Sequence, residues 1–190
     1  IRKAGQVGMN AENCDQKVEM VQLLAGQGYR SGESIARQLG VSRAAVWKRI
    51  EKLRASGVQI EKLPGKGYRL ASSIELLDES TILSALPAEV RMRVSRLEVL
   101  SRIDSTSGLL LGRLRSGAEI HGTFIFAEEQ TKGRGRRGRC WVSPFGRNIY
   151  VSFGWRFDGG ISELAGLSLV MGIAVARALR RVGVVGIGLK

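Results

Sequence analysis

The sequence predicts an α+β protein with a mainly helical first domain and an α/β second domain. In the first third, apolar residues recur at helical spacing and a hairpin-like pattern follows them. After residue 74, strand-like and helix-like segments alternate. The 190 residues, 44% of them hydrophobic, suffice for two domains if one is small. We expect a tail at 1–13, a first domain at 14–73 and a second domain at 74–190.

Three helices are predicted in the first domain from their caps and periodicity. Asp15 is an N-cap candidate for the first helix, which Gly26 ends. Ser31 precedes the second helix, and Ser42 can cap the third, from residue 43 to about 55. The short turn between the second and third helices is typical of a helix-turn-helix.

A β-hairpin with a basic tip follows the third helix. Residues 58–63 and 68–70 have strand composition, and the Pro-Gly-Lys-Gly sequence at 64–67 is typical of a turn. The hairpin favours a winged helix-turn-helix over the alternative of an ordinary helical hairpin with a solvated charged face. The residues expected to contact DNA are Ser42, Arg43, Trp47, Lys48, Arg49 and Lys66.

The net charge of +13 divides into +7 for residues 1–73 and +6 for residues 74–190. Residues 1–73 hold 13 basic against 6 acidic side chains, and residues 74–190 hold 17 against 11. A broadly basic first domain suits a nucleic-acid partner. The second domain has six more basic than acidic side chains, and the cations in and after one short segment equal this excess in number. They are Lys132, Arg134, Arg136, Arg137, Arg139 and Arg147.

Most of these six cations lie in the segment 130–141, QTKGRGRRGRCW. Its alternating glycines and arginines can bring backbone amides and guanidinium groups onto one small anion. A dinucleotide fingerprint is disfavoured because it needs a helix to begin within the motif and residues 139–144 are a poor helix start. No Gly-Lys-Ser/Thr follows for a Walker loop. A flexible Arg/Gly run that binds nucleic acid nonspecifically is the other alternative. Strand-like segments at 123–127 and 148–153 bracket the loop, which favours an ordered anion site.

The rest of the second domain has recognisable boundaries. Asp78 is expected to cap a helix at 79–86, and residues 94–103 are expected to form a strand that leads to the hydroxyl-rich segment 104–107. On the sequence alone, N-capping is the simplest role for Ser105 and Thr106, ahead of a helix with Leu110 and Leu114 inside. The remaining segments are a strand at 123–127, sheet residues at Trp141 and 149–155, a helix with a core-facing stripe at 164–182, and a strand at 184–189.

The block GRGRRGRCWVSPFGRNIYVSF closely resembles the active-site signature of biotin protein ligases. The segments SGESIARQLGVSRAAVWKRIEKLRASGV and PGKGYRL resemble the DNA-binding domain of the bifunctional members that repress the biotin operon. The resemblance implies a winged helix-turn-helix followed by an α/β catalytic domain with a mixed sheet, incomplete because the sequence stops within the family's Lys-Trp-Pro-Asn-Asp strand. It therefore implies a weakly active or inactive fragment.

The resemblance also implies a set of site residues. Arg136 and Lys190 are the expected catalytic residues. The matching family motif is Asp-Ser-Thr-Asn, so Ser107 replaces the asparagine in this chain. The residues expected to bind biotin or its adenylate are Ser105, Thr106, Ser107, Gln130, Gly133, Arg134, Gly135, Arg136, Trp141 and Lys190.

The implied reaction is activation of biotin by ATP and transfer to a lysine of a carboxylase carrier domain, with Mg²⁺ expected beside ATP. Operator DNA and a ligand-dependent homodimer are the other implied partners. Two cysteines and one histidine give no support to a zinc site or disulfide framework, and no signal peptide or membrane span is evident, so we expect a cytoplasmic protein. The alternative is a winged-helix regulator whose second domain senses a ligand without catalysis.

Overall fold

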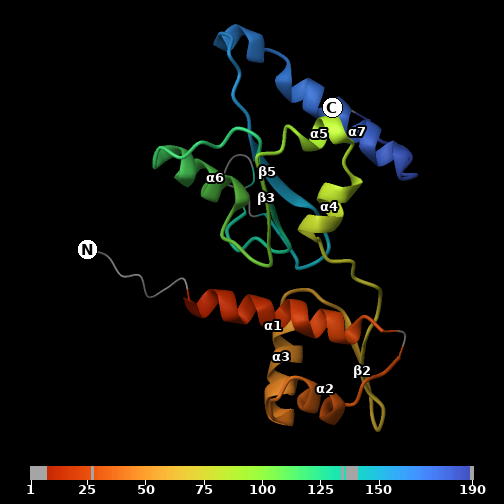
Figure 1. Ribbon diagram of the computed structural model, residues 1–190. Coiled ribbons are helices and arrows are strands. Elements are labelled where there is room, and N and C mark those ends of the chain that lie inside the picture. Colours follow the sequence, from red (N-terminus) through yellow and green to blue (C-terminus); the bar gives the residue numbers. More distant parts are fainter. Residues whose placement is uncertain (1–7, 27, 134, 136–140, 189–190) are drawn as a thin grey trace. The chain divides into compact units, whose positions relative to one another are not determined.

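A computed structural model describes residues 8–26, 28–133, 135 and 141–188 (Figure 1). They fall into two compact units, 1–155 and 156–190. The first unit begins with helices α1 (Gly8–Leu24), α2 (Gly32–Gln38) and α3 (Arg43–Ala55), followed by an antiparallel hairpin of β1 (Ile60–Leu63) and β2 (Gly67–Leu70). This order confirms the predicted winged helix-turn-helix.

Hydrogen bonds confirm the predicted cap of α3 and show that Ser31 caps α2 in the same way. Ser31 Oγ accepts from the Ser34 amide at 3.0 Å, and Ser42 Oγ accepts from the Ala45 amide at 3.2 Å. Each bond satisfies an amide that has no partner within the helix. The helices and the hairpin enclose one apolar core, made of Met20, Val21, Leu24, Ile35, Ala36, Val46, Ile50, Leu53, Val58 and Ile60.

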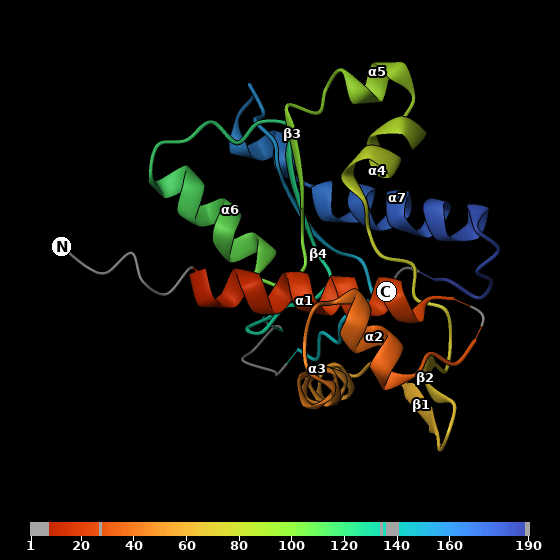
Figure 2. The ribbon, with the colours of Figure 1, turned by 60° about the horizontal axis from the view of Figure 1, so that its bottom comes forward.

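A three-stranded mixed sheet forms the second part of this unit. Strand β3 (Arg96–Leu100) runs parallel to β4 (Thr123–Ala127), and β4 pairs antiparallel with β5 (Tyr150–Gly154). Helix α6 (Thr106–Arg115) lies beside β4 and β5, and α4 (Glu79–Ala85) lies on the other side of the sheet in both views (Figures 1 and 2). The short helix α5 (Ala88–Arg91), which was not predicted, joins α4 to β3.

The turn 143–146 connects the sheet to the helical core. Phe145 is completely buried and belongs to the apolar cluster of α1, α2 and α3, although it lies far from them in the sequence. Its amide donates to the Ser56 carbonyl at 3.2 Å, and the Gly146 amide donates to the Glu128 carbonyl at 3.1 Å. The turn that follows the Gly/Arg-rich segment is therefore anchored on both sides.

Several boundaries differ from the expected ones. Helix α1 begins at Gly8, so Asp15 is not its N-cap; residues 8–14 contain no proline and can continue the helix backwards. On α6, Thr106 and Leu110 form the buried face, and Leu114, about 80° round the helix from Thr106, is 51% exposed. Trp141 lies outside the strands, because β5 starts only at Tyr150.

The second unit contains one turn of 3₁₀ helix (Ile161–Leu164) and helix α7 (Leu167–Arg181). Gly166 separates them with φ of 85°, a conformation that favours glycine and explains why α7 starts later than expected. Val170 and Leu179, expected in a core-facing stripe, are exposed. The strand expected at 184–189 is absent from its described part, 184–188, where Gly186 has a positive φ.

Candidate functional site

A polar cluster lies where β4 ends and α6 begins. Gln130 follows β4 and forms a parallel bridge with Ile103. Its Oε1 accepts from the Thr106 amide at 2.9 Å and from Thr106 Oγ1 at 3.2 Å. Thr106 Oγ1 also lies 2.8 Å from Ser152 Oγ on β5, and Thr106 is only 3% exposed. These contacts bring the predicted residues Thr106 and Gln130 together with Ser152, which the sequence analysis missed.

The predicted serines beside this cluster lie on the first turn of α6. Ser105 Oγ accepts from the Gly108 amide at 3.3 Å, so the capping role expected for Ser105 is confirmed, whereas the Thr106 hydroxyl contacts Gln130 and Ser152 instead of capping the helix. Ser105 Oγ also lies 3.0 Å from Ser107 Oγ, and Ser107 is exposed. The side chain that replaces the family asparagine therefore contacts Ser105 at the surface.

Asp104 fixes the start of the Gly/Arg-rich segment. Its carboxylate accepts from Lys132 Nζ at 2.8 Å and from Thr131 Oγ1 at 2.7 Å, and its carbonyl accepts from the Lys132 amide at 2.8 Å. The hydrogen bonds from Lys132 and Thr131 lower the pKa of Asp104 below its usual value. Lys132, one of the six predicted cations, is thus paired with a carboxylate next to the site.

Gly133 and Trp141 lie at the two described ends of this segment and contact each other. A Cβ atom at Gly133 would lie 3.0 Å from Trp141 Cδ1 and 3.1 Å from Ser143 Oγ, so a larger residue here would require these side chains to move by a few tenths of an ångström. Gln130 Nε2 is near the same point, at 3.5 Å. The predicted residues Arg134, Arg136 and Lys190 lie outside the described residues, and Gly135 is described without its neighbours.

Two acidic residues between β4 and Gln130 connect other parts of the unit. Glu129 accepts from Lys17 Nζ on α1 at 2.6 Å. Glu128 is buried and accepts from the Leu77 amide at 2.5 Å. Burial raises the pKa of the Glu128 carboxyl, and the hydrogen bond from Leu77 opposes that shift only in part.

We expect Glu128→Gln to stabilise the protein increasingly as the pH rises. Because the folded-state pKa of Glu128 is raised, its contribution to stability is present below the ordinary value of 4.5 and is lost as the pH increases through the folded-state value. Glutamine keeps the carbonyl acceptor for Leu77 but carries no charge. Urea unfolding over a pH series measures the difference, and the exposed Glu75→Gln is the matched control. If the difference in free energy of unfolding between Glu128→Gln and wild type does not change with pH, the raised pKa of Glu128 is contradicted.

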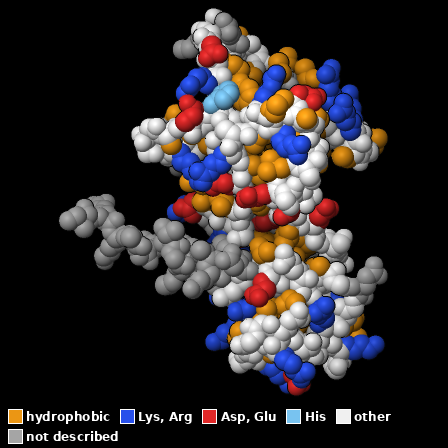
Figure 3. All heavy atoms as spheres, viewed as in Figure 1, with side chains coloured by type: hydrophobic (Ala, Val, Ile, Leu, Met, Phe, Trp, Pro, Cys, Tyr) orange, Lys and Arg blue, Asp and Glu red, His pale blue; other side chains and the backbone are white. Residues whose placement is uncertain are grey.

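The predicted DNA-binding residues lie on α3 and at the hairpin tip. Arg43, Trp47, Lys48 and Lys66 are exposed, and Trp47 is 52% exposed. Figure 3 shows Lys and Arg side chains spread over the lower part of this view, where α2, α3 and the hairpin lie. Arg49 differs, because its side chain is only 17% exposed and forms an ion pair with Glu19 at 3.6 Å.

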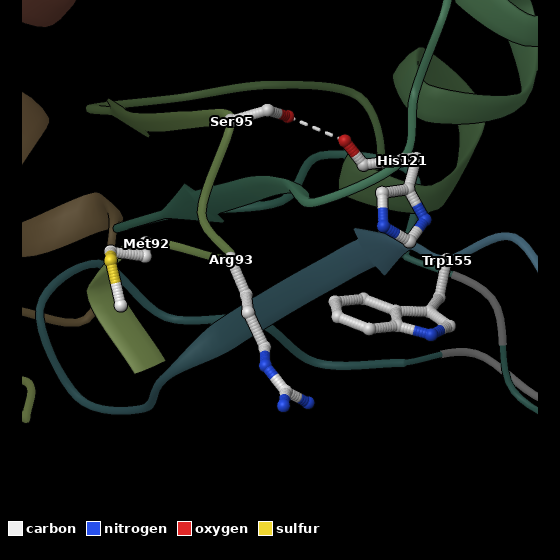
Figure 4. A pocket seen from close by; sticks show the side chains of 5 residues that line it. All are labelled: Met92, Arg93, Ser95, His121 and Trp155. Atoms are coloured by element: carbon white, nitrogen blue, oxygen red, sulfur yellow. Dashed lines mark hydrogen bonds between the residues drawn. The ribbon is translucent and has the colours of Figure 1, made fainter. Parts of the chain in front are cut away.

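A hollow of about 380 Å³ lies at the end of the sheet away from the polar cluster of Thr106, Gln130 and Ser152 (Figure 4). It is lined by Met92, Arg93, Ser95, His121 and Trp155, and the His121 and Trp155 rings are 4.4 Å apart. His121 forms a parallel bridge with Gly154 at the end of β5. Of the predicted site residues that the structure describes, none lines this hollow.

Among the described residues, no group of three or more His, Cys, Asp or Glu side chains could hold a metal ion. The helices of the described chain also include none with the length and apolar character needed to cross a membrane.

Two segments of the chain match known protein families. Residues 17–69 match the family described as HTH domain, and residues 99–188 match the Biotin/lipoate A/B protein ligase family. The chain therefore joins a helix-turn-helix domain to a biotin/lipoate protein ligase segment. The resemblance to bifunctional biotin ligases and repressors is confirmed.

Among its relatives is the bifunctional ligase/repressor BirA of Salmonella typhimurium, 45% identical over 164 residues, which are 86% of this chain and 49% of that protein. The Escherichia coli protein of the same name is 44% identical over 87% of this chain and 49% of its own length. A biotin--[acetyl-CoA-carboxylase] ligase of Mycobacterium tuberculosis is 42% identical over 42% of this chain and 30% of that protein. The chain spans about half the length of the two bifunctional relatives.

Proposed function

We propose that this chain belongs to a biotin protein ligase that also represses transcription of biotin-synthesis genes. The ligase would activate biotin with ATP and transfer it to a lysine of a carboxylase carrier domain. The cluster of Thr106, Gln130 and Ser152 beside Gly133 carries this proposal, because it sets hydrogen-bonding groups beside a segment suited to a phosphate. The two matched families support the same combination of activities.

Both proposed steps move negative charge. A carboxylate oxygen of biotin attacks the α-phosphorus of ATP and pyrophosphate leaves; the lysine amine then attacks the acyl carbon of the adenylate, and AMP leaves. Fixed cations and amides near the phosphate lower such barriers by electrostatic preorganisation. We assign this role to Arg134, Arg136 and Lys190, with Gly133 and Gly135 allowing close approach of the backbone.

The ureido end of biotin would lie against the polar cluster. Gln130 can offer its Nε2 to the ring because its Oε1 is already occupied by Thr106. The hydroxyls of Ser105, Thr106 and Ser107 would border the same end, and Trp141 would supply an apolar wall. Mg²⁺ is expected to accompany ATP, but the described residues include no carboxylate cluster for it, so we assign it no step.

Pyrophosphate release tests the enzymatic proposal. Release that requires both biotin and ATP is the expected result for a preparation freed of other ligases, and it should be slow for these 190 residues, which span about half the length of the bifunctional relatives. Biotin binding without pyrophosphate release would instead favour a winged-helix regulator with a non-catalytic sensing domain. We further propose a cytoplasmic protein that dimerises when its ligand binds, which would match palindromic half-sites in the operator.

The logarithm of the affinity of the first domain for DNA is expected to fall linearly with the logarithm of the salt concentration. Each phosphate contact contributes about 0.9 to the slope, so Arg43, Lys48 and Lys66 together give a slope of about −2.7. Arg49 adds to it only if it leaves its ion pair with Glu19. Fluorescence anisotropy with labelled DNA at several salt concentrations measures the slope.

Lys48→Gln should reduce the magnitude of that slope by about 0.9, the contribution of one phosphate contact. Lys132→Gln is the matched control, because Lys132 is paired with Asp104 near the ligand site and should leave the slope unchanged. An affinity that does not depend on salt would contradict a phosphate-binding surface.

A further inference from the structure

Trp47 is a large, largely apolar side chain that the first domain leaves exposed. It is the fifth residue of α3, and it is 52% exposed. The buried residues of α3 are Val46, Ile50 and Leu53, and successive residues of a helix are turned by about 100°, so Trp47 is directed away from the core. Tryptophan is enriched at binding surfaces, because its ring is apolar and its Nε1 donates hydrogen bonds.

The side chains around Trp47 make this part of α3 positively charged. Arg43 lies one turn before Trp47 and Lys48 follows it directly; both are exposed, and neither forms an ion pair within the described part of the chain. Glu51, one turn after Trp47, is already paired with Arg54 at 3.0 Å. The phosphates of a duplex would neutralise the two free cations, whereas an apolar protein surface would leave them unpaired.

The place of Trp47 within the helix-turn-helix directs it to base edges. Helix α3 is the second helix of this motif, and such a helix lies in the major groove with its N-terminal residues against the bases. Ser42 caps this end of α3, and Ala44, one turn before Trp47, is small and exposed. The indole therefore projects from the half of α3 that contacts bases.

Among the four bases, thymine matches an indole most closely. In the major groove it presents a 5-methyl group beside the acceptor O4, whereas guanine presents two acceptors, adenine an acceptor and a donor, and cytosine a donor. An indole has an apolar ring for the methyl group and a single donor, Nε1, for the oxygen. It has no acceptor for the amino groups of adenine or cytosine.

We propose that Trp47 is a specificity-determining residue that recognises a thymine in the operator, with its ring against the 5-methyl group and Nε1 donating to O4. This inference rests on the proposed DNA binding of the first domain and adds the base that one residue reads. Arg43 and Lys48 contact phosphates, which position α3 but carry no sequence information. The division of roles predicts that base preference and salt dependence change independently.

The test removes one methyl group from the DNA and one side chain from the full chain. Duplexes selected by the wild-type chain from a random library should share a thymine at a fixed position. Replacing that thymine by deoxyuridine, which lacks only the 5-methyl group, should weaken wild-type binding about fourfold, the effect of one buried methyl-sized group. Trp47→Ser should bind the two duplexes equally, whereas Trp47→Phe keeps an apolar ring and should still prefer thymine.

Two further variants separate base recognition from charge and from general loss of apolar surface. Lys48→Gln should reduce the magnitude of the salt slope by about 0.9 and keep the fourfold preference for thymine. Trp47→Ser should do the reverse, losing the preference and keeping the slope. Met92→Ser removes an even more exposed apolar side chain outside the first domain and should change neither quantity.

The other outcomes contradict the proposal in distinguishable ways. Selected sites without a fixed thymine, or equal wild-type affinity for the thymine and deoxyuridine duplexes, would show that the 5-methyl group is not read. A fourfold preference that survives in Trp47→Ser would assign it to another residue. If Trp47→Ser weakens binding to every duplex equally and lowers the salt slope, Nε1 contacts a phosphate instead. Failure of the wild-type chain to bind any duplex would contradict the proposed DNA binding itself.

Discussion

Phe145→Ala is expected to lower the free energy of unfolding by about 3 to 5 kcal/mol, as for other fully buried phenylalanines. Phe145 is completely buried among the residues of the helical core, and Lys17 Nζ lies 5.6 Å from its ring centre. Alanine would leave a cavity beneath α1 and α3. Urea unfolding of the chain, followed by circular dichroism, measures the loss.

Val142→Ala provides the control for Phe145. Val142 is in the same loop but largely exposed, so its truncation should change the free energy of unfolding by less than about 0.5 kcal/mol. Because Phe145 supports the helix that would contact DNA, its loss should also weaken DNA binding. A similarly small effect for both variants would show that the turn does not complete the helical core.

Thr106→Val is expected to weaken binding of biotinyl-adenylate by roughly ten- to hundredfold, the range for leaving buried polar groups unpaired. Valine has nearly the same shape but removes the hydroxyl that links Gln130 Oε1 to Ser152 Oγ. The Thr106 amide would then be the only donor of this residue to Gln130. Equilibrium titration with the labelled adenylate measures the change.

Thr123→Val is the matched control for Thr106. Thr123 is similarly buried, on β4, but lies at the end of the strand away from Gln130. Its replacement should leave the dissociation constant unchanged. Equal weakening by both variants would indicate a general loss of packing instead of a specific contact.

Elements specified by neighbouring residues were predicted well. Helix α3 and strand β4 have the expected bounds, and Ser31, Ser42 and Asp78 cap the expected helices. A capping side chain and its amide are three residues apart, so both are visible in a short sequence window. The same applies to the hairpin turn between β1 and β2.

Features that depend on distant residues could not be predicted. Nothing near Phe145 indicates that it completes a core built from α1 to α3, and nothing near Glu129 indicates its ion pair with Lys17. Leu114 has the right spacing from Leu110 to be buried, but its exposure depends on what covers α6. Of these long-range contacts, the one made by Ser152 had a sequence signal, because a serine within the apolar strand β5 indicates a polar partner on that face.

At the candidate site, too, features set by neighbouring residues were predicted and contacts between distant residues were not. The glycines and arginines predict an anion-binding segment at 130–141, which stays a prediction, and the hydroxyls after β3 identified the start of α6. Sequence spacing could not place Gln130 against Thr106, because that contact requires the parallel pairing of β3 with β4. The same pairing brings residues 103–106 beside 129–132 and so assembles the cluster.

Titration of the wild-type chain with labelled biotinyl-adenylate tests the central claim most directly. The account predicts saturable binding at one site per chain, displaced by unlabelled adenylate and weakened by Thr106→Val but not by Thr123→Val. The absence of saturable binding, or binding that Thr106→Val leaves unchanged, would contradict the assignment of the Thr106, Gln130 and Ser152 cluster as the biotin site.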